Sequence, residues 1–144
     1  KQAVAPGVGQ RSVFEPIELY QTTIDPFDTE ALTGVIKTIK ELIPDTDSGL
    51  FNLQIDGVDK ATNVGDGGTT GPVTVPAGTN VAPGETHNVG ETAGTATDLA
   101  DYDTSIYCTD GTDTVGPITS SGPVDVFVEP DDAWVCTVTN TRPP

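Results

Sequence analysis

The chain has 144 residues, of which 22 are acidic and only 6 are Lys or Arg, so its formal net charge at pH 7 is −16. This length suits one domain with a real hydrophobic core. The negative charge disfavours nucleic acid and anionic lipid as partners, because both are polyanions. No apolar run approaches the roughly 18 residues of a membrane-spanning helix, so we expect no membrane span.

Residues 1–31 differ in kind from the rest of the chain. They carry Pro6, Pro16 and Pro26 among scattered apolar residues. We predict an N-terminal extension that is either a linker or an inter-subunit segment, since its apolar part is too hydrophobic for a purely solvated linker. The candidate inter-subunit residues are Val13, Phe14, Ile17, Leu19 and Tyr20.

Residues 32–144 are predicted to form an all-β domain. Short runs rich in β-branched residues alternate with turn signals, and the whole chain holds 16 Gly and 12 Pro. This pattern is typical of an antiparallel β-sandwich, here of about seven strands. The glycine-rich stretch 61–71 is expected to be a flexible hairpin loop. The expected strands are 34–41, 50–56, 72–75, 86–91, 103–108, 124–128 and 133–140.

The stretch 32–43 fits two interpretations. Its apolar residues recur at helical i, i+3, i+4 and i+7 spacing, and Asp28 or Thr29 could cap such a helix. Against a helix stand Gly34 and several β-branched residues, which favour a strand. The last expected strand is less ambiguous, because strict alternation places Trp134, Cys136, Val138 and Asn140 on one face.

The two cysteines, Cys108 and Cys136, are predicted to form a disulfide. A metal site would need clustered Cys or His, and His87 is the single histidine of the chain. No spacing brings a thiol and this histidine together as a nucleophile pair. A disulfide indicates an exported protein, so we expect an extracellular location.

Asp45 and Asp47 begin a pattern that resembles a calcium-binding loop. A bidentate Glu is missing at the twelfth position, so we expect a solvated turn, with calcium as the alternative. No cofactor is expected elsewhere, because the sequence lacks the nucleotide-binding motifs and the Gly-x-Ser-x-Gly motif of hydrolases.

Several short strings, in order, resemble a known family. They are Ile-Lys-Glu-Leu-Ile-Pro at 39–44, Ser-Gly-Leu-Phe-Asn-Leu at 48–53, Val-Gly-Glu-Thr-Ala-Gly at 89–94 and Val-Cys-Thr-Val-Thr-Asn-Thr at 135–141. Together they resemble the prealbumin-like repeat domains of bacterial surface proteins, related to collagen-adhesin B-type (CnaB-like) and pilin stalk domains. The resemblance covers about residues 32–142. It implies an immunoglobulin-like sandwich and favours a strand at 32–43.

Many members of that family carry an intramolecular isopeptide bond between a Lys on the first strand and an Asn on the last, promoted by an acid from a middle strand. The resemblance places these roles on Lys40, Asn140 and Glu91. Parity along the strand leaves Lys37 as the alternative lysine. The plain alternative is that these residues are solvent-facing polar groups at strand ends, as such side chains usually are.

The function we expect is that of a non-enzymatic structural module at a cell surface, either a stalk repeat or a filament or pilus subunit. Its partners would be copies of itself or neighbouring repeats. The alternative is an adhesin module whose loops bind host protein or glycan.

Overall fold

The computed structural model describes residues 28–144. The described residues divide into two units: residues 28–30 with Thr79–Val81, and Ala31–Gly78 with Ala82–Pro144. In the first unit, Asn80 Nδ2 donates a hydrogen bond of 2.6 Å to Asp28. The second unit holds the sandwich. The five candidate inter-subunit residues (13, 14, 17, 19 and 20) lie outside the described residues, and the boundary after residue 31 stays a prediction.

Nine strands and one 3-10 helix form the described part of the chain. Two of the nine, β3 and β7, were not expected from the sequence. No helix within 28–144 is long and apolar enough to cross a membrane. The elements are β1 (Ala31–Ile43), β2 (Phe51–Ile55), β3 (Val58–Val64), β4 (Val73–Thr79), β5 (Glu85–Ala93), η2 (Leu99–Asp101), β6 (Asp103–Thr109), β7 (Thr114–Ile118), β8 (Val124–Val128) and β9 (Ala133–Thr141).

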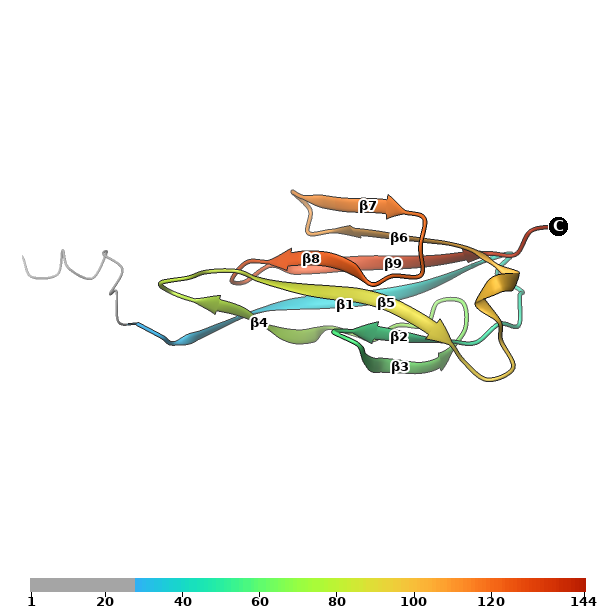
Figure 1. Cartoon of the computed structure of the whole chain (residues 1–144), viewed down its shortest axis with the longest axis horizontal. Coiled ribbons are helices and arrows are strands. Elements are labelled where there is room, and N and C mark those ends of the chain that lie inside the picture. Colours follow the sequence, from blue (N-terminus) through green and yellow to red (C-terminus); the bar gives the residue numbers. More distant parts are fainter. Residues whose placement is uncertain (1–27) are drawn as a thin grey trace, which may run out of the picture. The chain divides into compact units, whose positions relative to one another are not determined.

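The strands form two sheets packed as a sandwich, so the predicted fold class is confirmed (Figure 1). One sheet has the order β4-β1-β9-β6-β7 and the other the order β3-β2-β5-β8. The first and last strands, β1 and β9, run parallel side by side, whereas β9 pairs with β6 in antiparallel fashion. The first and last strands of the sandwich, β1 and β9, are therefore neighbours inside the five-stranded sheet.

The stretch that fitted both a helix and a strand is the strand β1. Alternate residues are buried from Gly34 to Leu42, with a half-exposed or exposed residue between each pair. Strand β1 has neighbours on both sides, β4 and β9. These pairings provide hydrogen-bond partners for the backbone of β1 on both sides. The choice between helix and strand, which local spacing left open, is therefore decided in favour of a strand.

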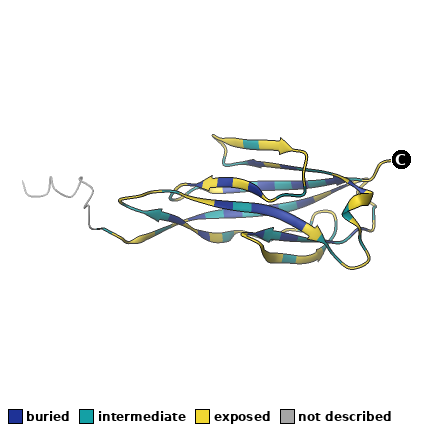
Figure 2. Cartoon of the chain, viewed as in Figure 1, coloured by how far each residue is buried: buried dark blue, intermediate teal, exposed yellow. Residues whose placement is uncertain are grey.

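The core lies between the sheets and consists of inward-facing apolar side chains. Figure 2 shows the resulting alternation of buried and exposed residues, with β7 mostly exposed. The expected common face of β9 is confirmed, because Trp134, Cys136, Val138 and Asn140 are all buried. The core residues are Ile36, Leu53, Ile55, Val75, Ala77, Val89, Ile106, Cys108, Val124, Val126, Val128, Trp134, Cys136 and Val138.

The prediction of a flexible hairpin loop at 61–71 is wrong. Residues 58–64 form β3 and pair with β2. The rest of the stretch lies along β1, where Lys40 N–H donates to Gly68 at 2.7 Å and Gly67 N–H donates to Lys40 at 2.9 Å. Glycines allow this close backbone approach because they have no side chain. From composition alone, the same glycines had indicated a flexible loop. The segment closes the edge of β1 beside Lys40.

Candidate functional site

Three strands bring Lys40, Glu91 and Asn140 together inside the sandwich. Lys40 comes from β1, Glu91 from β5 and Asn140 from β9, and their exposed fractions are 1%, 5% and 0%. Each lies on the inward face of its strand because it shares parity with buried neighbours. Charged and amide side chains are rarely buried to this degree without a partner. The alternative, that these are solvent-facing residues at strand ends, is wrong for all three.

The Lys40 amine occupies a closed pocket of polar and aromatic groups. Its Nζ lies 3.2 Å from Glu91 Oε1 and donates a hydrogen bond of 3.2 Å to the Val138 carbonyl. It also lies 4.3 Å from the centroid of the Phe51 ring. The amine is therefore held against β9 at the level of Val138, two residues before Asn140.

The Asn140 amide makes two hydrogen bonds through one atom and none through the other. Its Nδ2 donates to Glu91 Oε2 at 2.7 Å and to Thr104 Oγ1 at 2.9 Å. Its Oδ1 is buried and finds no hydrogen-bond partner among residues 28–144. A buried carbonyl oxygen without a donor is unfavourable by roughly 1 to 3 kcal/mol. Such a group in a native interior calls for an explanation.

Burial shifts the pKa of each of the two ionisable groups in the direction that favours its neutral form. Desolvation lowers the pKa of Lys40, although Glu91, Asp66 and Glu41 oppose the change. Desolvation likewise raises the pKa of Glu91, against the opposing effect of Lys40 and of the Asn140 hydrogen bond. A neutral amine is a nucleophile, and a neutral carboxylic acid can donate a proton. The cluster therefore places an amine, a carboxyl group and an amide in one buried site, and both pKa shifts favour the neutral forms.

Lys37 is not part of this cluster. It lies on the opposite face of β1 from Lys40 and is only half-buried. Of the two candidate lysines, Lys40 is the one that the fold brings to Glu91.

The predicted disulfide is confirmed. Cys108 in β6 and Cys136 in β9 are cross-strand partners, bonded with a Cα–Cα distance of 4.0 Å. Both residues are fully buried in the main core. The bond therefore fixes β6 to β9 on the same inward face that carries Asn140.

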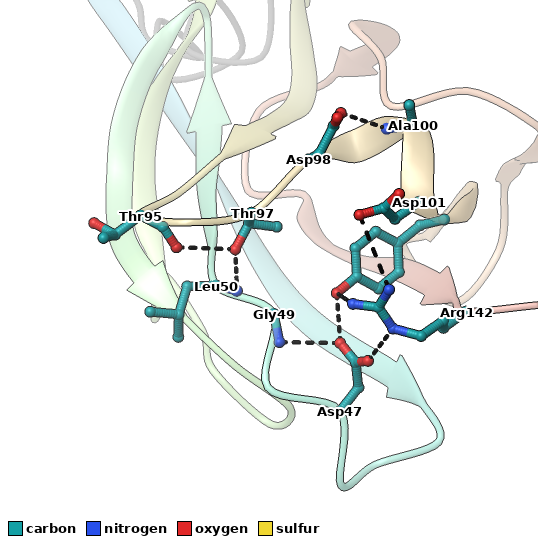
Figure 3. Close-up of polar contacts among 10 residues, drawn as sticks. Asp47, Gly49, Leu50, Thr95, Thr97, Asp98, Ala100, Asp101 and Arg142 are labelled. Carbon is teal, nitrogen blue, oxygen red and sulfur yellow. Dashed lines mark hydrogen bonds and ion pairs between the residues drawn. The ribbon is translucent and has the colours of Figure 1, made fainter.

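The turn that resembled a calcium loop contains an ion pair. Asp47 accepts hydrogen bonds from Arg142 Nε at 2.5 Å, from the Tyr102 hydroxyl at 2.5 Å and from Gly49 N–H at 3.0 Å (Figure 3). Asp101 lies 4.0 Å from the same guanidinium. The described part of the chain holds no group of three or more His, Cys, Asp or Glu residues placed for a metal ion.

Two aromatic rings connect this ion pair to the interior of the domain. The Arg142 guanidinium lies 4.5 Å from the centroid of Tyr102, whose ring meets Phe51 edge-on at 5.2 Å. Phe51 in turn contacts Lys40. The C-terminal end of β9 is therefore tied to the turn before β2 and to the lining of the buried cluster.

His87 forms a second buried polar site that sequence reasoning missed. Its Nδ1 lies 2.6 Å from Asp56 Oδ2 and its Nε2 lies 2.6 Å from the Pro76 carbonyl, while Glu85 is 3.7 Å away. Both ring nitrogens face acceptors, so the ring satisfies both contacts only as the doubly protonated cation. Although burial lowers the pKa of His87, the hydrogen bonds to Pro76 and Asp56 and the charge of Glu85 raise it overall.

Thr104 and Phe51 were also missed as parts of the site. Register explains both, because Thr104 lies directly opposite Asn140 on β6, and Phe51 begins the strand that pairs with β5. The inward parity of Thr104 with Ile106 and Cys108 was readable in the sequence. Its alignment with Asn140 depends on the pairing of strands far apart in the chain.

Comparison with known proteins identifies the class. The family described as prealbumin-like fold domain matches residues 34–142, and the chain belongs to this family. The expected resemblance is thus confirmed. Among solved structures, one match is the major pilin protein (T-13) of Streptococcus pyogenes, with 16% sequence identity and a TM-score of 0.36. The match covers 78% of this chain but only 46% of that chain, and no curated protein matches the sequence.

Proposed function

We propose that this chain is a non-enzymatic structural module of an extracellular surface protein, a stalk repeat or a filament subunit, in which Lys40 and Asn140 become joined by an isopeptide bond. The observation that carries the proposal is the dry cluster of Lys40, Glu91 and Asn140. All three side chains are buried among core residues, which favours chemistry within the chain over an outside substrate. The chemistry therefore acts on the chain itself.

The residues supply each part of the reaction. The neutral Lys40 Nζ attacks the Asn140 side-chain carbonyl carbon and forms a new carbon–nitrogen bond. The bond from that carbon to Nδ2 then breaks, and one proton from Nζ passes through Glu91 to the leaving nitrogen, which departs as ammonia. Glu91 suits this transfer because it contacts both the amine and the amide.

The position of the cross-link favours a mechanical role. It joins the first and last strands of the domain, β1 and β9, which lie side by side and run parallel. A pull on the two ends of the domain loads these strands first. A covalent bond between them carries the load and shields the chain between Lys40 and Asn140 from extension.

Intact-mass spectrometry tests the cross-link. The protein should be lighter than its sequence mass by one ammonia, beyond the two hydrogens lost in the disulfide. Proteolysis should then yield a branched peptide joining Lys40 to Asn140, and K40A should lack both signatures while K37A keeps them. A wild-type mass that differs only by the disulfide would overturn the cross-link.

Self-assembly is a separate element of the proposal, with copies of the chain or neighbouring repeats as partners. Electron microscopy of the native material should show filaments or stalks. In the full chain, replacing Phe14 and Leu19 by Asp should weaken association measured by sedimentation, since both are candidate inter-subunit residues. Filaments that form unchanged in this variant would remove the N-terminal extension from the contact.

A binding module is the alternative function. A groove of about 250 Å³ on the four-stranded sheet is lined by Gln54, Asn88, Glu91, Thr92 and Ser121, together with three glycines and Pro123. Such groups suit a sugar, but ligand pockets usually measure roughly 300 to 1,000 Å³. Selective binding on a glycan array, lost in N88A, would favour this alternative.

A further inference from the structure

We propose that the Thr104 hydroxyl takes part in the cross-linking reaction, as the second hydrogen-bond donor to the Asn140 carbonyl oxygen when negative charge develops there. The inference rests on the proposed isopeptide bond and adds a residue to its mechanism. Thr104 touches the reacting amide directly, since its Oγ1 lies 2.9 Å from Asn140 Nδ2.

The backbone pairing of β6 with β9 fixes the position of Thr104. It lies opposite Asn140 in the antiparallel pairing of β6 with β9. Two residues further along β6, Ile106 faces the core, so the Thr104 side chain points to the same interior. Four residues along each strand, the disulfide between Cys108 and Cys136 fixes the register of the same pair.

In the proposed reaction the two ends of the Asn140 amide exchange places. Nδ2 now occupies a position between Glu91 and Thr104, at 2.7 and 2.9 Å, while Oδ1 lies buried without a donor among residues 28–144. A half-turn of the amide interchanges oxygen and nitrogen with little change in shape. The oxygen then lies between the same two groups.

Both groups can reverse their roles after such a turn. A hydroxyl donates as well as accepts, and so does a carboxylic acid once it is protonated. Burial raises the pKa of Glu91 and favours that protonated form. Two donors at 2.7 and 2.9 Å match the distances at which oxyanion-stabilising groups act, which are about 2.7 to 3.1 Å.

The lone pair of neutral Lys40 Nζ forms the bond to the Asn140 carbonyl carbon, and the π electrons of the carbonyl move onto Oδ1, where Glu91 and Thr104 donate to it. When the carbonyl re-forms, the bond to Nδ2 breaks. Nδ2 leaves as ammonia with one proton that came from Nζ, which is bonded to the same carbon in the tetrahedral intermediate. The Thr104 hydroxyl keeps its own proton throughout.

The experiment follows cross-link formation in the full chain after a pulse of cell-free synthesis. Samples are taken over time, the folded fraction is isolated by size-exclusion chromatography, and the loss of ammonia is measured by intact mass. T104V removes the hydroxyl at almost constant volume and should slow the reaction by roughly 100-fold or more. T104S keeps the hydroxyl and should restore a rate close to that of the wild type.

A matched control comes from Thr38 on β1. It is fully buried on the inward face of the strand that carries Lys40, and its Oγ1 has no hydrogen-bond partner within the described range 28–144. T38V makes the same chemical change and should leave the rate unchanged. The pH dependence adds a second readout: T104V should lower the rate at every pH without moving the midpoint of the profile, because the titrating groups are untouched.

Each outcome decides a different point. If T104V cross-links as fast as the wild type, or if T104S is as slow as T104V, the role of the hydroxyl is overturned. If T38V slows the reaction equally, the effect is one of packing and the inference fails. A wild-type chain that never loses ammonia would instead overturn the proposed function itself. If T104V does not fold, T104A and T104S make the same comparison.

Discussion

Lys40 Nζ lies 3.2 Å from Glu91 Oε1, and neither side chain is exposed to solvent. Burying two opposite charges costs several kcal/mol for each ion, and their mutual attraction offsets this only partly. Burial lowers the pKa of Lys40 and raises the pKa of Glu91, and both shifts favour the neutral form of the group. A pair that is unfavourable as a structural ion pair suits the proposed reaction, in which the lysine amine would become part of an amide and could no longer carry a charge.

The first prediction concerns stability. K40A should lose the cross-link that closes most of the domain, and by the chain-entropy estimate for a covalent loop of this size it should lose about 4 to 5 kcal/mol of unfolding free energy. Denaturant unfolding monitored by Trp134 fluorescence measures the change. K37A, a matched change on the outward face of the same strand, should stay within about 0.5 kcal/mol of the wild type. Equal stability in both variants would contradict the prediction.

The second prediction concerns force. In single-molecule pulling from the two ends, the wild-type domain should not extend between Lys40 and Asn140, because the cross-link carries the load. K40A should release the intervening residues that lie outside the disulfide loop and lengthen by roughly 240 Å more than the wild type. A wild-type domain that extends as far as K40A would show that no covalent bond joins β1 to β9.

The third prediction concerns pH near neutrality. The pKa of His87 is raised in the folded protein from its ordinary 6.5, so the protonated ring stabilises the fold fully below that ordinary value. This contribution should be lost as the pH rises through the higher folded pKa. Unfolding free energy measured from pH 6 to pH 9 should therefore fall.

D56N should flatten this dependence, because it removes the carboxylate that accepts the Nδ1 proton of His87. Asp125 provides the control, since it is an exposed carboxylate on the neighbouring strand β8. D125N should keep the full slope. A slope of the opposite sign in the wild type would contradict the doubly protonated ring.

The fourth prediction concerns acid. Hydrogen bonds from Arg142, the Tyr102 hydroxyl and Gly49 lower the pKa of Asp47 from 3.8 to about 2. The ionised carboxylate stabilises the fold fully above pH 3.8, and that contribution should be lost as the pH falls through 2. Acid unfolding curves of R142Q should show lower stability near pH 5 and a smaller loss below pH 4.

Lys60 on β3 gives the matched control for this experiment. It is exposed, and K60Q removes the same charge from a different place. K60Q should keep the acid profile of the wild type. If it changes the profile as much as R142Q does, the effect is one of net charge and not of the contact with Asp47.

Local pattern revealed much of the fold. The alternation in β9 correctly predicted its inward face, and turn signals located seven of the nine described strands. Strands β3 and β7 were missed because their sequences contain polar residues, or Gly116 and Pro117, which locally indicate turns. Both lie at sheet edges, where little burial marks a strand.

The candidate site was predicted only in part. Family resemblance pointed to Lys40, Glu91 and Asn140, but parity alone left Lys37 as an alternative. The position of Thr104 opposite Asn140 had no local signal, since the two residues are far apart along the chain. The contact of Arg142 with Asp47 was hidden for the same reason.

The sequence by itself determined the class of fold, the acidic surface and the pairing of the only two cysteines, because these follow from composition, periodicity and number. Only the tertiary structure decided which polar residues lie in the dry interior. Burial and distance depend on how distant strands pair, and the reactivity of a lysine depends on both. One of the six basic residues of this acidic chain lies buried beside a glutamate and an asparagine because β1, β5 and β9 meet there.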